Sequence, residues 1–253
     1  MIPYHRFDGP ADAPVLLLSN SLGTTHQMWE PQMPALTAHF RVLRYDRRGH
    51  GQSEVPPGPY SMADLGGDVI ELLDSLELER VSYCGLSIGG MDAMWNAANA
   101  PERIDRLALC STSPCLSPRE LWDERAATAR AGALDTLVDA TMERWFSDAF
   151  RAEQPATVAR IRAMVASTPA EGYAGCSEAI RDWEFAGELG RISAPTLVLS
   201  AEDDPSTPPE HGRVIANAVE SATVAVLPSP TRHLSNWEQP EAFTAALLEH
   251  LLG

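Results

Sequence analysis

The stretch CGLSIGGM (84–91) places Ser87 between two glycines at G-x-S-x-G spacing, and a third glycine follows at once. An apolar run, RVSYCGL (80–86), precedes the serine, and IGGMDAMWNAANAP (88–101) follows it with helical spacing. A strand that turns sharply into a helix leaves little room for Cβ atoms, and such a turn exposes its serine hydroxyl. The stretch therefore predicts a strand–turn–helix unit with Ser87 as nucleophile, although a plain turn around a buried serine has the same spacing.

Further apolar runs recur on both sides of this turn. We expect strands at 14–20, 41–46, 80–86, 106–112, 194–204 and 222–228, and helices at 62–76, 88–101 and 241–252. Strands and helices in alternation indicate parallel βαβ units. The predicted fold class is therefore α/β, with a mostly parallel central sheet flanked by helices.

The alternation stops between residues 117 and 190. This segment contains no convincing strand, and its apolar residues are spaced as in a series of helices. Open α/β sheets bind ligands at the carboxyl ends of their strands, so a helical insertion between strands is expected to cover that edge. We expect a core domain formed by 1–116 and 191–253, and a helical cap formed by 117–190.

Composition excludes several classes of partner. The 253-residue chain has a formal net charge of −16, which disfavours nucleic acid and anionic membrane surfaces. No run reaches the roughly 18 apolar residues of a membrane span, and the N-terminal MIPYHRFDG lacks the features of a signal peptide. Four scattered cysteines without a C-x-x-C pair argue against a metal site. We therefore expect a cytoplasmic protein, and the sequence leaves a homo-oligomer open.

A nucleophilic serine needs a base, which follows the serine in chain order in enzymes with this turn. His211, His233 and His250 are the histidines that follow Ser87. His233 lies in TRHLSNWEQP, directly after the last expected strand, where a base should stand. The spacing S-N-W-E in that run predicts a capping box at the start of the next helix. We expect His233 to be the base.

The acid that orients this histidine is expected in SAEDDPSTPP, after the strand at 194–204. The alternative loop STSPC (111–115) has no carboxylate. Glu202, Asp203 and Asp204 are all available, and Asp204 is preferred because it opens a D-x-x-T-P turn. Either aspartate fits a second interpretation, in which it only caps that turn.

The oxyanion of a tetrahedral intermediate needs two further donors. The backbone N–H of Ile88, next to the serine, is one candidate. Leu22 in SNSLGTT is the other, because the adjacent Gly23 lets the backbone turn inward, although the same run fits a plain turn equally well. The run YDRRGHGQS (45–53) also combines charge, histidine and glycine, but it precedes the serine, and we expect it to be a structural turn.

These motifs together resemble the α/β-hydrolase superfamily. Within it, the chain is most similar to the 3-oxoadipate enol-lactonases. The similarity rests on LSNSLGTT…MW (18–29), GLSIGGM (85–91), ERWF (143–146), EGYAGCSEAIRD (171–182), DPSTPPEHGRVIA (204–216) and HLSNWEQPEAF (233–243). These stretches span nearly the whole chain, including the expected cap.

The resemblance implies a serine hydrolase that opens a lactone through an acyl-enzyme, without metal or cofactor. The triad would be Ser87, Asp204 and His233. The partner would be a small lactone or ester. A general carboxylesterase or a lactonase of other specificity is the alternative, followed by carbon–carbon bond hydrolases and by a non-catalytic binding protein.

The implied lactone carries an acetate arm, which an acidic protein must bind with local cations or donors. Arg144 and Trp145 in the expected cap are the candidates, although a core tryptophan beside a surface arginine fits the same run. Arg130 and Arg181 are weaker candidates. Because Arg144 and Trp145 are adjacent on a helix, we do not expect both to face the pocket squarely. Two further tryptophans, Trp183 and Trp237, are bulkier than expected for the family and would alter the pocket if they pointed into it.

Overall fold

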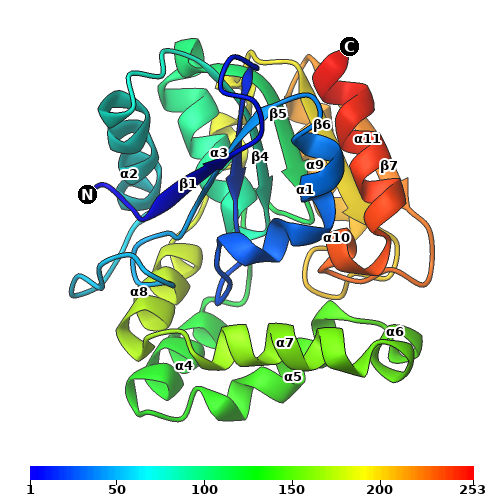
Figure 1. Ribbon diagram of the computed structural model, residues 1–253. Coiled ribbons are helices and arrows are strands. Elements are labelled where there is room, and N and C mark those ends of the chain that lie inside the picture. Colours follow the sequence, from blue (N-terminus) through cyan, green and yellow to red (C-terminus); the bar gives the residue numbers. More distant parts are fainter.

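A computed structural model describes residues 1–253 (Figure 1). The centre of the molecule is one sheet of seven strands. The strands are β1 (His5–Asp8), β2 (Val15–Ser19), β3 (Arg41–Tyr45), β4 (Val81–Leu86), β5 (Ile104–Cys110), β6 (Thr196–Ala201) and β7 (Ala222–Leu227). Their order is β1-β3-β2-β4-β5-β6-β7. β1 is antiparallel to β3, and every other neighbouring pair is parallel. The predicted fold class is confirmed.

Helices connect the strands. The α-helices are α1 (Met33–Leu36), α2 (Met62–Ser75), α3 (Ile88–Asn99), α4 (Arg119–Arg130), α5 (Asp135–Trp145), α6 (Asp148–Glu153), α7 (Pro155–Ala166), α8 (Ala170–Arg181), α9 (Pro209–Ala218), α10 (Ser235–Glu238) and α11 (Pro240–Leu252). Short 3₁₀ helices are η1 (His26–Gln32), η2 (Pro101–Arg103) and η3 (Ala186–Arg191).

Both faces of the sheet are buried. Along β2, Leu17 packs into a core shared with α2, α3 and α9, whereas Leu16 and Leu18 pack into a core shared with α1 and α11. Successive side chains of a strand point to opposite faces, so a strand covered on both sides is apolar throughout. This explains why PVLLLSN reads as a continuous apolar run.

Helices α4 to α8 form an insertion between β5 and β6, and they group together beyond the carboxyl ends of the strands (Figure 1). The backbone of α8 meets a core loop directly, because a Cβ atom on Gly172 would lie 1.9 Å from the carbonyl oxygen of Gly49. The glycine pair thus lets the cap approach the core closely. We propose that the cap domain extends over 117–190 and the core domain over 1–116 and 191–253.

Candidate active site

Ser87 stands on a strained turn between β4 and α3. Its φ of 61° and ψ of −122° are rarely adopted by residues with a side chain. A Cβ atom on Gly85 would lie 2.0 Å from the carbonyl oxygen of Gly89, so the turn excludes side chains there. The Ser87 N–H donates to the carbonyl of Cys110 at 3.0 Å, and Thr112 Oγ1 donates to the Ser87 carbonyl at 2.7 Å. The turn therefore holds the serine backbone rigidly, as predicted for the strand–turn–helix unit.

His233 and Asp204 form a buried pair. His233 Nδ1 lies 2.8 Å from Asp204 Oδ2, and the two residues are 3% and 2% exposed. Burial opposes ionisation of Asp204, but the charge of His233 and hydrogen bonds from His233, Thr207 and the Ser206 N–H lower its pKa. The carboxylate is thus ionised at neutral pH. Because it engages Nδ1, Nε2 is the nitrogen left for a proton from Ser87.

The other candidate acids and bases lie elsewhere. Glu202 and Asp203 are exposed, and neither contacts the histidine. His211 lies on α9 and His250 on α11, and neither lines the cavity that contains Ser87. The structure therefore brings together the preferred three residues, Ser87, Asp204 and His233, and leaves the alternatives outside.

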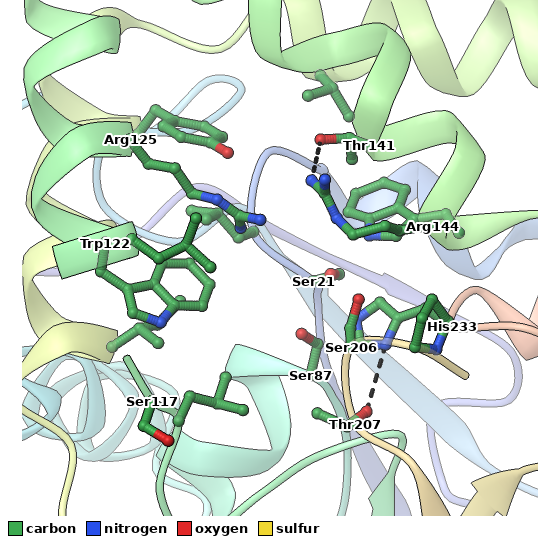
Figure 2. A pocket seen from close by; sticks show the side chains of 18 residues that line it. Ser21, Ser87, Ser117, Trp122, Arg125, Thr141, Arg144, Ser206, Thr207 and His233 are labelled. Carbon is green, nitrogen blue, oxygen red and sulfur yellow. Dashed lines mark hydrogen bonds between the residues drawn. The ribbon is translucent and has the colours of Figure 1, made fainter. Parts of the chain in front are cut away.

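A cavity of about 170 Å³ lies between the core and the cap (Figure 2). Its residues come from the turns after the strands and from the cap helices. They are Ser21, Leu22, Ser87, Leu116, Ser117, Leu121, Trp122, Arg125, Thr141, Arg144, Trp145, Val165, Tyr173, Ile180, Pro205, Ser206, Thr207 and His233. The space suits a small molecule held between an apolar wall and a few polar groups.

Leu22 lines this cavity, and its amide is free to donate. The amides on either side are used, since the Ser21 N–H contacts a methionine sulfur and the Gly23 N–H donates to His50 Nε2 at 3.0 Å. Ile88 begins α3, where the first N–H groups have no partner within the helix. The geometry is thus compatible with the two predicted oxyanion donors, Leu22 and Ile88.

Two arginines without carboxylate partners face the cavity from the cap (Figure 2). Arg144 donates to Thr141 Oγ1 at 2.9 Å, and Arg125 stacks 4.5 Å from the ring centroid of Trp122. Burial, reinforced by the positive charge of Arg125, lowers the pKa of Arg144. Arginine nevertheless stays protonated in proteins. The cavity therefore holds uncompensated positive charge, although the protein has a net charge of −16.

We did not select Arg125 as a candidate from the sequence, but the spacing of Arg125 from Trp122 could have indicated that it faces the cavity. It follows Trp122 by three residues on α4, so the two share a helix face, and that face is turned toward the cavity. The weaker candidates Arg130 and Arg181 do not line the cavity. Arg130 is paired with glutamates on α8, and Arg181 is paired with aspartates.

The candidate tryptophans differ in their position relative to the cavity. Trp145 and Arg144 both line the cavity, and the expectation that they do not both face it squarely stays a prediction. They lie about 100° apart around the last turn of α5, and the cavity is wide enough to border both side chains. The Trp145 ring lies 6.1 Å from the His233 ring. Trp183 and Trp237 do not line the cavity, and their indole N–H groups donate to backbone carbonyls.

The predicted capping box at the end of the histidine loop is wrong. Ser235 makes no cap hydrogen bond, and its hydroxyl has no partner. The Glu238 carboxylate instead accepts the Ser147 N–H from the cap, at 2.7 Å, and the Arg232 N–H from the histidine loop. Glu238 therefore joins the cap to the loop that carries His233.

The loop at 45–53 supports the site without lining the cavity. Asp46 accepts the backbone and ring N–H groups of His26 at 2.7 and 2.8 Å. His50 accepts the Gly23 N–H at Nε2, and its Nδ1 lies 3.1 Å from the Arg48 carbonyl. Burial, followed by the positive charge of Arg47, lowers the pKa of His50 to about 4. The ring is therefore neutral at physiological pH and keeps a lone pair for Gly23.

This histidine should make stability sensitive to acid. The pKa of His50 is about 4 in the folded protein against 6.5 as the ordinary value. Between these values the unfolded chain binds more protons, so stability falls as pH drops from 6.5 to 4. The shift corresponds to about 3 kcal/mol. The free energy of unfolding, measured by urea denaturation, is compared at pH 7 and pH 4. We expect the difference between these two values to be smaller by about 3 kcal/mol in His50→Gln than in the wild type. An unchanged difference would contradict the assignment.

The comparisons with known proteins agree with this geometry. A family model described as the alpha/beta hydrolase fold matches residues 14–240. The 3-oxoadipate enol-lactonase 2 of Acinetobacter baylyi is 37% identical over 94% of this chain and 89% of its own length. The crystal structure of the enol-lactonase from Burkholderia xenovorans LB400 is 42% identical, with a TM-score of 0.96, over 99% of this chain and 96% of that one.

A second group of relatives has a different described activity. RutD of Agrobacterium fabrum, named as a carbamate hydrolase, is 31% identical over 96% of this chain and 94% of its own length. No helix in the structure is both long and apolar enough to span a bilayer. The family model covers most of the chain, and both relatives exceed 30% identity over nearly its full length. The chain therefore belongs to the α/β-hydrolase family.

Proposed function

We propose that this protein is a serine hydrolase that opens the enol-lactone of 3-oxoadipate. The observation that carries the proposal is that Ser87 and His233, which is hydrogen-bonded to Asp204, line a small cavity with two unpaired arginines in its cap wall. The first group is suited to attack on an acyl carbon. The second is suited to a substrate carboxylate, which the acetate arm of this lactone provides.

The proposed reaction begins when His233 Nε2 takes the proton of Ser87 and the serine oxygen attacks the lactone carbonyl. Asp204 holds the imidazole in place and stabilises its charged form. The Leu22 and Ile88 amides receive the developing negative charge. As the tetrahedral intermediate collapses, the ring C–O bond breaks, and His233 returns its proton to the leaving enol oxygen.

The acyl-enzyme is then hydrolysed. Water loses a proton to His233 and attacks the acyl carbon, and the imidazolium reprotonates Ser87 as the product carboxylate leaves. The enol tautomerises to the ketone, which gives 3-oxoadipate. The protons transferred during acylation and hydrolysis pass through His233, whereas the released enol exchanges its proton with solvent as it becomes the ketone.

The position of the arginines fits this substrate. Arg125 and Arg144 come from α4 and α5, whereas Ser87 and His233 come from the core, so the carboxylate and the reacting carbonyl would bind at opposite walls of the cavity. Trp145 lies beside His233, with 6.1 Å between the two ring centroids. The resulting orientation would present the lactone carbonyl to the serine.

Carbamate hydrolysis is the second candidate, favoured by the similarity to RutD. Mass spectrometry of an acid-quenched reaction separates the two. A lactone keeps its leaving group in the acyl chain, so the acyl-enzyme should carry the full mass of the lactone on the peptide that contains Ser87. A carbamate or an open-chain ester loses its leaving group on acylation. An adduct absent from that peptide under single-turnover conditions would contradict the proposed reaction.

A further inference from the structure

Ser21 has a buried hydroxyl that the protein itself does not use. The residue is 1% exposed, it lines the cavity, and its Oγ has no hydrogen-bond partner. An unsatisfied buried hydroxyl destabilises the folded state, so such groups are uncommon unless something outside the fold satisfies them. Because Ser21 also lines the cavity, a bound molecule can supply the missing hydrogen-bond partner.

The backbone around Ser21 directs this contact. Thr24 Oγ1 donates to the Ser21 carbonyl at 2.7 Å, and the Thr24 N–H does so at 3.2 Å. The peptide between Ser21 and Leu22 is thereby fixed. In a trans peptide the N–H points opposite to the carbonyl, so the Leu22 N–H is turned away from Thr24. The next N–H, of Gly23, is held by His50, which fixes the orientation of Leu22 from its other side.

Covalent geometry places the Ser21 hydroxyl beside the Leu22 amide. Four bonds separate Ser21 Oγ from the Leu22 nitrogen, which keeps the two atoms within about 5 Å of each other in any rotamer. An oxygen that accepts the Leu22 N–H is therefore within reach of the Ser21 O–H. Figure 2 shows the Ser21 side chain projecting into the cavity that Ser87 and His233 border.

We propose that Ser21 is a catalytic residue whose hydroxyl donates a third hydrogen bond to the oxyanion, together with the Leu22 and Ile88 amides. The proposal rests on the serine-hydrolase function proposed above. The hydroxyl keeps its proton and only donates it in a hydrogen bond. This bond strengthens as the carbonyl oxygen becomes negative, because hydrogen bonds to charged acceptors are the stronger ones. The contact therefore stabilises the transition state more than the bound substrate.

The test is Ser21→Ala, assayed with p-nitrophenyl acetate and with the enol-lactone. We expect kcat to fall about 10- to 100-fold with both substrates, while KM changes less than about 3-fold. The midpoint of thermal unfolding should stay the same or rise, because the substitution removes an unsatisfied buried hydroxyl. Loss of activity without loss of stability is a result that a merely structural serine would not give.

Ser235→Ala provides the matched control. Ser235 is also 1% exposed and its hydroxyl also lacks a partner, but it does not line the cavity. This variant should keep the wild-type kcat. An unchanged kcat in Ser21→Ala would overturn the proposal. So would an effect limited to KM of the anionic lactone, since the hydroxyl would then contact the substrate carboxylate. If the wild type hydrolysed neither substrate, the proposed function itself would fail, and the third donor with it.

Discussion

Ser87→Ala is expected to lower kcat for ester and lactone substrates by at least about 10⁴-fold, because it removes the nucleophile on which both chemical steps depend. The His233–Asp204 pair and the oxyanion donors stay in place and leave only a small residual rate over the uncatalysed reaction. The Ser87 side chain makes no cap hydrogen bond to α3, so alanine removes no such contact and the fold should persist. Initial rates with p-nitrophenyl acetate, measured alongside thermal unfolding, check this result.

A serine-reactive phosphonate gives a second readout for the same variant. The wild type should be labelled once, on the peptide that contains Ser87, and Ser87→Ala should not be labelled. Labelling requires the base as well as the nucleophile, so it reports on the whole site. The assignment of Ser87 as nucleophile would be wrong if the alanine variant kept a tenth of the wild-type rate, or if the phosphonate still labelled the same peptide in that variant.

Removing a cavity arginine should have the second largest effect. We expect Arg144→Met to lower kcat/KM for the carboxylate-bearing lactone about 100-fold and to change kcat/KM for neutral p-nitrophenyl acetate little. The reason is that Arg144 and Arg125 have no carboxylate partner in the protein, so their charge is available to the substrate. Arg125→Met should act in the same direction. The ratio of the two kcat/KM values is the quantity to measure.

Arg130→Met is the matched control for this ratio. Arg130 is on α4, like Arg125, but Glu171 and Glu178 compensate its charge, and it does not line the cavity. This variant should leave the ratio unchanged. The arginine pair would have no part in substrate selection if Arg144→Met and Arg130→Met gave the same ratio.

The free energy of unfolding should also distinguish Arg144→Met from Arg130→Met. The positive charge of Arg125 contributes to the lowered pKa of the half-buried Arg144, which means that the two like charges oppose each other in the free enzyme. Arg144→Met should therefore be at least as stable as the wild type, whereas Arg130→Met loses ion pairs. An anionic substrate would relieve the opposition between Arg125 and Arg144, which is how their charge favours binding.

The sequence predicted the parts of the fold that depend on long apolar runs. The six parallel strands and the helices α2, α3 and α11 lie where hydrophobic periodicity placed them. The strand β1 (His5–Asp8) was not predicted. It is four residues long, mixed in polarity and antiparallel at the edge of the sheet, and none of its residues is fully buried, so it gives no clear apolar pattern.

Local motifs predicted side-chain contacts poorly where residues from distant segments form hydrogen bonds with the same side chain. Glu238 is spaced from Ser235 as in a capping box, but it accepts hydrogen bonds from Ser147 and Arg232 instead, and Ser147 is far away in sequence. Similarly, the D-x-x-T-P turn favoured Asp204 over its neighbour Asp203, but only the fold shows Asp204 buried against His233. Spacing along the chain does not contain these tertiary contacts.

The measurement that tests the central claim most directly is kcat/KM of the wild-type protein for 3-oxoadipate enol-lactone, followed by the loss of lactone absorbance. The account predicts a value of about 10⁴ M⁻¹s⁻¹ or more, as enzymes reach with their own substrates, and well above the value for p-nitrophenyl acetate. Hydrolysis of the lactone no faster than that of p-nitrophenyl acetate would contradict the account. It would leave Ser87, His233 and Asp204 as a hydrolase site with another substrate.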